Sequence, residues 1–208
     1  MTGGLAPEKL AHLREHYFEP RSEWARTRIA RVLDAAAPRA GERLLDLGCA
    51  NGTFSFHAAR AGARPVGVDR DAAVLAEGRS AAAASGGGAT PRVCGDCARL
   101  PFRDAAFDLV INADFIEHVP DGIKPSIYRE MHRVLRPGGR AVVYSPNRAR
   151  VVNELRGEWL KRLCGLRREP VPRWQEHVDP DHFGLTTPGI TAAQLRAAGF
   201  RVRVGFHE

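Results

Sequence analysis

The residues of this 208-residue sequence that could do chemistry gather where short apolar runs end. The run "RLLDL" ends beside a turn, residues 48–52, that carries Gly48 and Gly52 and leads into a helical pattern. Glycines let the backbone approach a ligand closely, and the first N–H groups of a helix have no partner within it. Asp46, just before the turn, suits a cationic group such as an amine, although it could also cap local N–H groups. Because glycine turns occur in unrelated proteins, this turn alone does not identify a ligand.

Further polar residues end the next three apolar runs. Asp69 ends the second run, where a carboxylate can accept both hydroxyls of a ribose. Asp96 ends the third, and it is either an acceptor for an adenine amino group or an ordinary loop carboxylate. Residues 112–114 end the fourth and would reach the same edge of a sheet. Together these residues predict a site for one nucleoside that bears a charged group.

Alternating strand and helix patterns would position these residues. The apolar runs are 43–47, 64–69, 90–96, 107–114 and 139–146, followed by a sixth at 200–206. Three helical patterns lie between the first five runs, and Pro137, Gly138 and Gly139 are expected to end the last of them, before the fifth run. Such alternation predicts a doubly wound α/β fold, whose mostly parallel sheet is covered on both faces. Ligands of such sheets bind at the carboxyl ends of the strands, where the strand order reverses.

The composition indicates one globular domain. Hydrophobic residues make up 44% and charged residues 26% of the chain, and the formal net charge is +7. The arginines are spread along the chain, which favours solvated basic faces over a dedicated nucleic-acid surface. We expect a cytoplasmic protein with reduced cysteines, because no signal peptide and no run of roughly 18 apolar residues is present.

The ordered blocks resemble the class I S-adenosylmethionine-dependent methyltransferases, in particular the small-molecule branch with ubiquinone-biosynthesis-like enzymes. The resemblance rests on "LLDLGCANG", "VGVDRD", "GDCARLPFRDAAFDLV", "DFIEHV" and "VLRPGG", and more loosely on "HFGLTTP" and "LRAAGF". Five blocks in order are far more specific than a lone glycine turn. The resemblance implies a Rossmann-like methyltransferase fold with S-adenosyl-L-methionine as cofactor. It also implies methyl transfer to O, N or C of a small-molecule metabolite or natural product.

The resemblance assigns cofactor contacts to the four strand ends. The turn would hold the methionine part, the second end the ribose, the third the adenine, and the fourth the sulfonium side. The residues concerned are Asp46, Gly48, Cys49, Ala50, Asn51 and Gly52; Asp69 and Arg70; Asp96 and Cys97; and Asn112, Ala113 and Asp114. Two departures stand out: Ala50 replaces the family's middle glycine, and the chain stops at Glu208, so we expect the seventh strand to be lacking.

Methyl transfer from a sulfonium needs alignment in a dry site, and a base helps where the acceptor is a hydroxyl. His182 in "HFGLTTP" matches a family position near the acceptor and is the first candidate base, with His118 second. His177 has no such match, and we expect no metal. Cys94 and Cys97 form a single CxxC, which favours packing thiols over a zinc site.

The chain divides into four expected segments: an N-terminal helical cap (1–40), the cofactor-binding core (41–146), an acceptor-side lid (147–185) and a last helix and strand (186–208). Tyr17, in the cap, could close over the cofactor or pack in the core. Residues 153–173 predict an amphipathic helix with a basic face. That face could meet an anionic acceptor, a carrier protein or a membrane surface, or it could be solvated; the oligomeric state is open.

The sequence also bears on three alternative functions. A nucleic-acid or protein methyltransferase would suit the basic charge, but "NADF" is not the Asn/Asp-Pro-Pro-aromatic turn of base-amino methylases. A dinucleotide oxidoreductase is disfavoured because the turn reads Gly-x-Ala-x-Gly, with Thr53 where a third glycine would fall. A catalytically inactive S-adenosylmethionine-binding partner protein is a further alternative.

Overall fold

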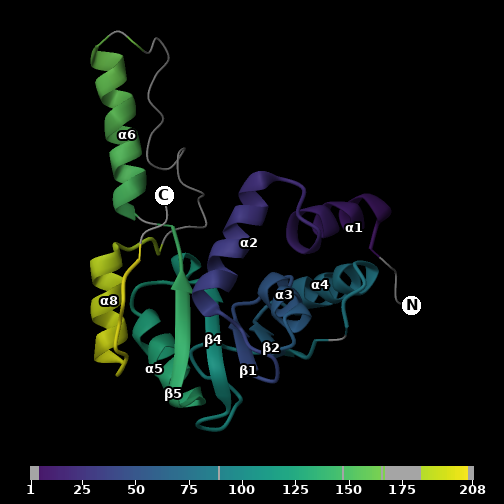
Figure 1. Cartoon of the computed structure of the whole chain (residues 1–208). Helices are drawn as coiled ribbons and strands as arrows, with labels where there is room; N and C mark the ends of the chain where they lie inside the picture. Colours follow the sequence, from purple (N-terminus) through teal and green to yellow (C-terminus); the bar gives the residue numbers. More distant parts are fainter. Residues whose placement is uncertain (1–4, 89, 147, 165, 167–183, 206–208) are drawn as a thin grey trace.

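The computed structural model describes residues 5–88, 90–146, 148–164, 166 and 184–205. Its centre is a five-stranded, all-parallel sheet in the order β3-β2-β1-β4-β5 (Figure 1). The strands are β1 (Arg43–Leu47), β2 (Arg64–Asp69), β3 (Arg92–Cys94), β4 (Phe107–Ala113) and β5 (Leu135–Tyr144). The strand order reverses beside β1, which confirms the doubly wound α/β fold and places the glycine turn at the reversal.

Helices cover both faces of the sheet. One face packs against α2 (Glu23–Ala36) and α3 (Thr53–Arg60), with α4 (Ala72–Ala84) beside β3. The other packs against α5 (Lys124–Val134) and α8 (Pro188–Ala197). Alternation along β1 explains the two layers, because Leu44 joins the α2–α3 core whereas Leu45 and Leu47 join the α5–α8 core.

Four further elements belong to the described part of the chain. Helix α1 (Pro7–Leu13) continues into a single π-helical turn, η1 (Arg14–Phe18), and both pack against α4. A 3-10 turn, η2 (Ile116–His118), follows β4 almost directly. Helix α6 (Arg148–Leu163) follows β5. None of the helices described is long and apolar enough to cross a bilayer.

The structure corrects three expectations. Residues 201–205 form no strand: a groove lined by Val143, Leu195 and Val202 lies between this segment and β5, so their backbones do not pair. The helix predicted before the fifth run, α5, ends at Val134 and not at Pro137, because Leu135 already pairs with Phe107 in the sheet.

The third correction concerns the predicted acceptor-side lid. Helix α6 projects away from the sheet instead of covering its carboxyl edge (Figure 1). The side chains of Trp159, Leu160 and Leu163 on its outer turns are exposed. Residues 167–183 of the expected lid lie outside the described part of the chain.

Candidate functional site

The register of the sheet brings the predicted strand ends to one level. Asp69 pairs with Cys94, and Leu47 pairs with Val68, so the residue after β1 is level with Asp69. On the other side, Asp46 pairs with Ile111, which brings the end of β4 to the same edge. The four polar segments therefore converge as the sequence predicted.

The glycine turn, residues 48–52, is folded back onto the end of β2. Its φ angles are 70° at Gly48, 43° at Ala50 and 81° at Gly52, so every second residue is left-handed. The N–H groups of Gly48 and Cys49 both donate to the Val68 carbonyl at 2.9 Å. Ala50 carries a Cβ in a conformation that L-residues adopt at a cost of roughly 1–2 kcal/mol. Alanine at position 50, where the family usually has a glycine, therefore adds strain to the backbone of the turn.

Close approach makes the two glycines necessary. A Cβ at Gly48 would lie 2.7 Å from the Cβ of Phe115, and one at Gly52 would lie 2.7 Å from Arg92 Nη2. Beside them, Asn51 Oδ1 is shielded from solvent and has no hydrogen-bond partner among the described residues. An unsatisfied acceptor at a helix N-terminus, next to a glycine cradle, fits a ligand that donates hydrogen bonds, such as an amine.

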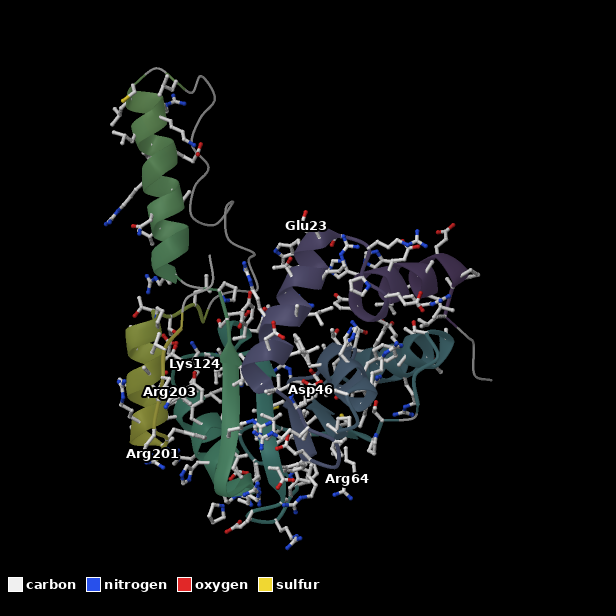
Figure 2. The ribbon with its side chains drawn as sticks, in the orientation of Figure 1. Glu23, Asp46, Arg64, Lys124, Arg201 and Arg203 are labelled. Carbon is white, nitrogen blue, oxygen red and sulfur yellow. The ribbon has the colours of Figure 1, made fainter. Side chains whose placement is uncertain are left out.

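Asp46 has the capping role that was one of its two predicted alternatives. Its Oδ2 accepts from both the N–H and the hydroxyl of Ser55 at 2.8 Å, in the first turn of α3. Figure 2 shows Asp46 inside the body, next to α3, and the side chain is buried. Burial raises the pKa of this carboxyl to about 6, against the lowering effect of the Ser55 bonds. Asp46 thus helps to position the glycine turn by binding the first turn of α3.

Asp69 connects the turn to the next helix. Its Oδ2 accepts from the Ala50 N–H at 2.9 Å, and its Oδ1 accepts from the Asp71 N–H at 3.0 Å. A carboxylate offers about four acceptor positions, so about two remain. The side chain is half-buried, which leaves those positions accessible to a diol.

The third strand end contains the CxxC. Cys94 is exposed and its S–H points at the Arg70 carbonyl (3.4 Å), whereas Cys97 is buried. Asp96 is exposed, and its Oδ1 accepts from the Ala98 N–H at 2.8 Å. Burial, with smaller effects of the carboxylates of Asp69, Asp96 and Asp46, raises the pKa of Cys97 to about 12. Burial also raises the pKa of Cys49.

The fourth strand end divides between two directions. Asn112 is fully buried and its amide contacts Met131 Sδ of α5 at 3.9 Å, so its side chain turns away from the glycine turn. Ala113 is buried, and Asp114 has a φ of 52° with its N–H bonded to the Tyr144 carbonyl at 2.9 Å. Of these three residues, the structure brings the side chain of Asp114 to the edge.

Comparisons with known proteins agree with this arrangement. Residues 44–139 match the family described as Methyltransferase domain. That match spans β1 to the start of β5 and contains the whole glycine turn and the Asp69 and Asp96 strand ends. Residues 44–139 are therefore similar to a methyltransferase domain. This confirms the predicted resemblance to class I S-adenosylmethionine-dependent methyltransferases.

Individual relatives are similar over part of their length. A ubiquinone biosynthesis O-methyltransferase of Pseudomonas aeruginosa (strain UCBPP-PA14) is 33% identical over 68% of this chain and 61% of that protein. A demethylmenaquinone methyltransferase of Beutenbergia cavernae is 39% identical over 54% of this chain and 44% of that protein. The chain thus spans less than two thirds of these relatives. The PH0226 protein of Pyrococcus horikoshii OT3 shares the fold, with a TM-score of 0.64, 23% identity, and 90% and 89% coverage of the two chains.

Arg28 lies at the carboxyl edge of the sheet, and its role there was not predicted from the sequence. Its guanidinium pairs with Asp114 and lies between the rings of Trp24 (5.4 Å) and Phe54 (5.5 Å). The pair joins α2 to the residue after β4. The Trp24-x-x-x-Arg28 spacing on one helix face was the available signal.

The predicted aromatic cap is mainly part of a core. Tyr17 packs with Leu13 and Phe18 against α3 and α4. Its carbonyl accepts from His57 Nε2 at 3.2 Å, and burial lowers the pKa of that histidine. These contacts favour the packing role of Tyr17 over closure onto a ligand.

A buried polar cluster below η2 was also missed. Glu117 is 0% exposed, and neither carboxylate oxygen has a hydrogen-bond partner among the described residues, although Ser145 is near enough to lower its pKa. Burial dominates and raises that pKa to about 7. Lys124 (labelled in Figure 2) is equally buried, and it donates to Asp121 Oδ1 (2.7 Å) and to the Gly184 carbonyl. Only the order "EHV…DGIK" hinted at this cluster.

Of the two candidate bases, His118 lies within the described residues and His182 does not. His118 is half-buried at the end of η2, one residue from Glu117. His182 and His177 lie outside the described residues. The N–H of Gly184, two residues after His182, donates to the Glu117 carbonyl at 2.7 Å, so the chain returns to η2 there. Within the described part of the chain, no group of three or more His, Cys, Asp or Glu side chains could hold a metal ion.

Proposed function

We propose that this chain transfers a methyl group from S-adenosyl-L-methionine to a small-molecule acceptor with a quinone-type or related aromatic ring. The observation that carries the proposal is the glycine turn, whose Ala50 N–H is bound by Asp69 at the reversal of strand order. The names of the relatives support the acceptor class, because they concern ubiquinone and demethylmenaquinone. O-methylation is the first expectation, with N and C as alternatives.

The chain's own residues would hold the cofactor at the converged strand ends. The turn and Asn51 Oδ1 would receive the methionine amine, the outward acceptor positions of Asp69 the ribose hydroxyls, and the Asp96–Cys97 segment the adenine. The backbone of Ala113 and Asp114 would line the sulfonium side. S-adenosylmethionine supplies, when bound, an electrophilic methyl group on a charged sulfur.

The remaining work of the protein is alignment and proton removal. The Arg28–Asp114 pair and the packed cap, residues 1–40, would keep water from the edge and keep its geometry constant. His182, and after it His118, would accept the proton of a hydroxyl acceptor, because an imidazole is the side chain that most often serves as a general base. Alanine at His118 would then lower kcat without weakening cofactor binding.

Calorimetric titration tests the cofactor. We expect binding of S-adenosylhomocysteine and no binding of NAD. Asp69→Ala should weaken S-adenosylhomocysteine at least tenfold, because a charge-assisted hydrogen bond contributes about 1.5–3 kcal/mol. Asp69→Asn, which retains one acceptor oxygen, should lie between alanine and the parent. Exposed Asp34 on α2 provides the control, and Asp34→Ala should leave the affinity unchanged. Unaltered affinity in Asp69→Ala would contradict the ribose role, and binding of NAD alone would contradict the function.

Acceptor screening tests the reaction. Catechols and hydroquinones, simple phenols, amines and total RNA should be compared with labelled S-adenosylmethionine. We expect label in the catechols or hydroquinones. Label in RNA alone would overturn the small-molecule assignment, and cofactor binding without transfer to any class would favour the inactive binding protein.

A further inference from the structure

Helix α6 exposes an apolar stripe at its outer end. Val152, Leu155, Trp159 and Leu163 follow one another at helical spacing, so they lie along one face. Val152 and Leu155, nearer the sheet, are half-buried, whereas Trp159 is 55% and Leu163 is 78% exposed. Exposure therefore increases as α6 leaves the body.

The exposure of this segment is unusual for the molecule. Eight large apolar side chains are exposed among the described residues, and four of them lie within residues 159–166. The four are Trp159, Leu160, Leu163 and Leu166. Contiguous exposed apolar side chains mark an interaction surface, whereas single ones need no explanation.

Basic side chains border the stripe. On a helical projection of about 100° per residue, Arg156 and Arg162 lie roughly 60° to either side of Trp159. Neither makes an ion pair with a described residue, whereas Lys161 is bound to Glu158 at 2.8 Å. Two exposed guanidinium groups beside a tryptophan and leucines form the pattern of helices that lie in a lipid interface.

The position of α6 gives this surface an orientation. The helix starts just after β5, and its Arg148 N–H donates to the Thr186 carbonyl at 3.2 Å, which ties its base to the segment before α8. It projects from the carboxyl end of the sheet, the edge that carries the glycine turn (Figure 1). A flat partner that receives the tip of α6 would thus face the edge where an acceptor enters.

We propose that the outer half of α6 docks on an anionic lipid surface. Burial of the apolar side chains of Trp159, Leu163 and Leu166 in the lipid favours binding. The guanidinium groups of Arg156 and Arg162 favour negatively charged headgroups over neutral ones. A second copy of this chain fits less well, because two such faces would bring like charges together. Residues 148–163 span about 24 Å and carry several charges, so the helix lies on the surface and does not cross it.

Vesicle binding tests this proposal without cofactor or acceptor, so its outcome is independent of the proposed methyl transfer. The full chain should cosediment with vesicles of 30% phosphatidylglycerol in phosphatidylcholine, and 0.5 M salt should weaken this binding about tenfold or more. Pure phosphatidylcholine should bind more weakly. In a Trp24→Phe/Trp174→Phe background, the emission of Trp159 should shift to the blue and become protected from iodide on binding.

Matched variants locate the contact. Trp159→Ser/Leu163→Ser should lower the partition coefficient at least tenfold, because each side chain loses apolar burial. Arg156→Glu/Arg162→Glu should lower it for anionic vesicles by a similar factor. The control Arg103→Glu/Arg196→Glu, at exposed arginines elsewhere, changes the net charge equally and should retain most of the binding.

Three results would overturn the proposal. The first is the absence of cosedimentation by a folded full chain. The second is equal loss of binding in the control and the α6 charge variants, which would mean that net charge alone acts. The third is a dimer in light scattering that Trp159→Ser/Leu163→Ser dissociates, which would assign the stripe to a second copy.

Discussion

The glycine turn and helix α6 both follow a strand at the carboxyl edge of the same sheet, and they differ in what surrounds them. The turn is bound by Asp69, Val68 and, through Asp46, by the start of α3. Helix α6 exposes Trp159 and Leu163 and has few contacts with the body. Contacts from neighbouring segments therefore fix the conformation of the turn, whereas the outer half of α6 is exposed among the described residues.

The hydrophobic pattern of a segment and the contacts that surround this segment in the fold are therefore separate properties. An amphipathic pattern states which face of a helix is apolar, but not what covers that face. At the glycines of the turn, by contrast, residue type and surroundings are linked. A side chain there would meet both a left-handed backbone and close neighbours. The following predictions exploit this difference between the two regions.

Two mid-helix glycines should respond in opposite directions to alanine. A Cβ at Gly78 of α4 would lie 2.6 Å from the Cα of Asn51 in the turn, whereas one at Gly157 of α6 meets nothing within 4 Å. Gly78→Ala should destabilise the protein by about 2–3 kcal/mol through overpacking. Gly157→Ala should stabilise α6 by about 0.5–1 kcal/mol, as alanine does in free helices. Urea unfolding measures both; equal signs would refute the contrast.

Buried and solvated carboxyls should differ in pH dependence. The pKa of Glu117 is raised to about 7 by burial, so the folded state binds its proton more tightly than the unfolded one. Its contribution is complete below about pH 4.3 and is lost as pH rises through 7, an effect on the order of 3 kcal/mol.

Glu117→Gln should remove this slope between pH 5 and 8 in urea titrations. Asp46, whose pKa is about 6, is present in both proteins and cancels in the difference. Glu158→Gln, on α6, should leave the slope intact, because an exposed pair with Lys161 contributes little. A wild-type slope in Glu117→Gln would show that this carboxyl is ionised in the fold.

The smallest expected effect concerns the strain at Ala50. Ala50→Gly relieves a left-handed residue with a φ of 43°, and it should raise stability by about 0.5 kcal/mol after the unfolded-state entropy of glycine is subtracted. The melting temperature should rise by about 1–2 °C. Exposed Ala30 in α2 is the comparison, and Ala30→Gly should lower stability by about 1 kcal/mol. A decrease in both variants would mean that the turn tolerates alanine without strain.

Most of the fold follows from local patterns. The first two strands were predicted with the observed limits, because hydrophobic period and turns are encoded over a few residues. The failure at residues 201–205 has a long-range cause. An alternating "FRVRVGF" predicts a strand, but a strand needs a partner backbone, and the groove beside Val143 separates the two.

The site shows the same division. By itself, the sequence determined the alternation of strands and helices, the glycine turn and the acidic strand ends, since residue type and spacing are properties of short segments. Tertiary structure decided that Asp46 caps α3, that Arg28 reaches Asp114 and that Glu117 is buried with no hydrogen-bond partner for its carboxylate among the described residues. It also left Trp159 and Leu163 of α6 exposed. Such outcomes depend on contacts between distant segments, whose packing no local pattern specifies.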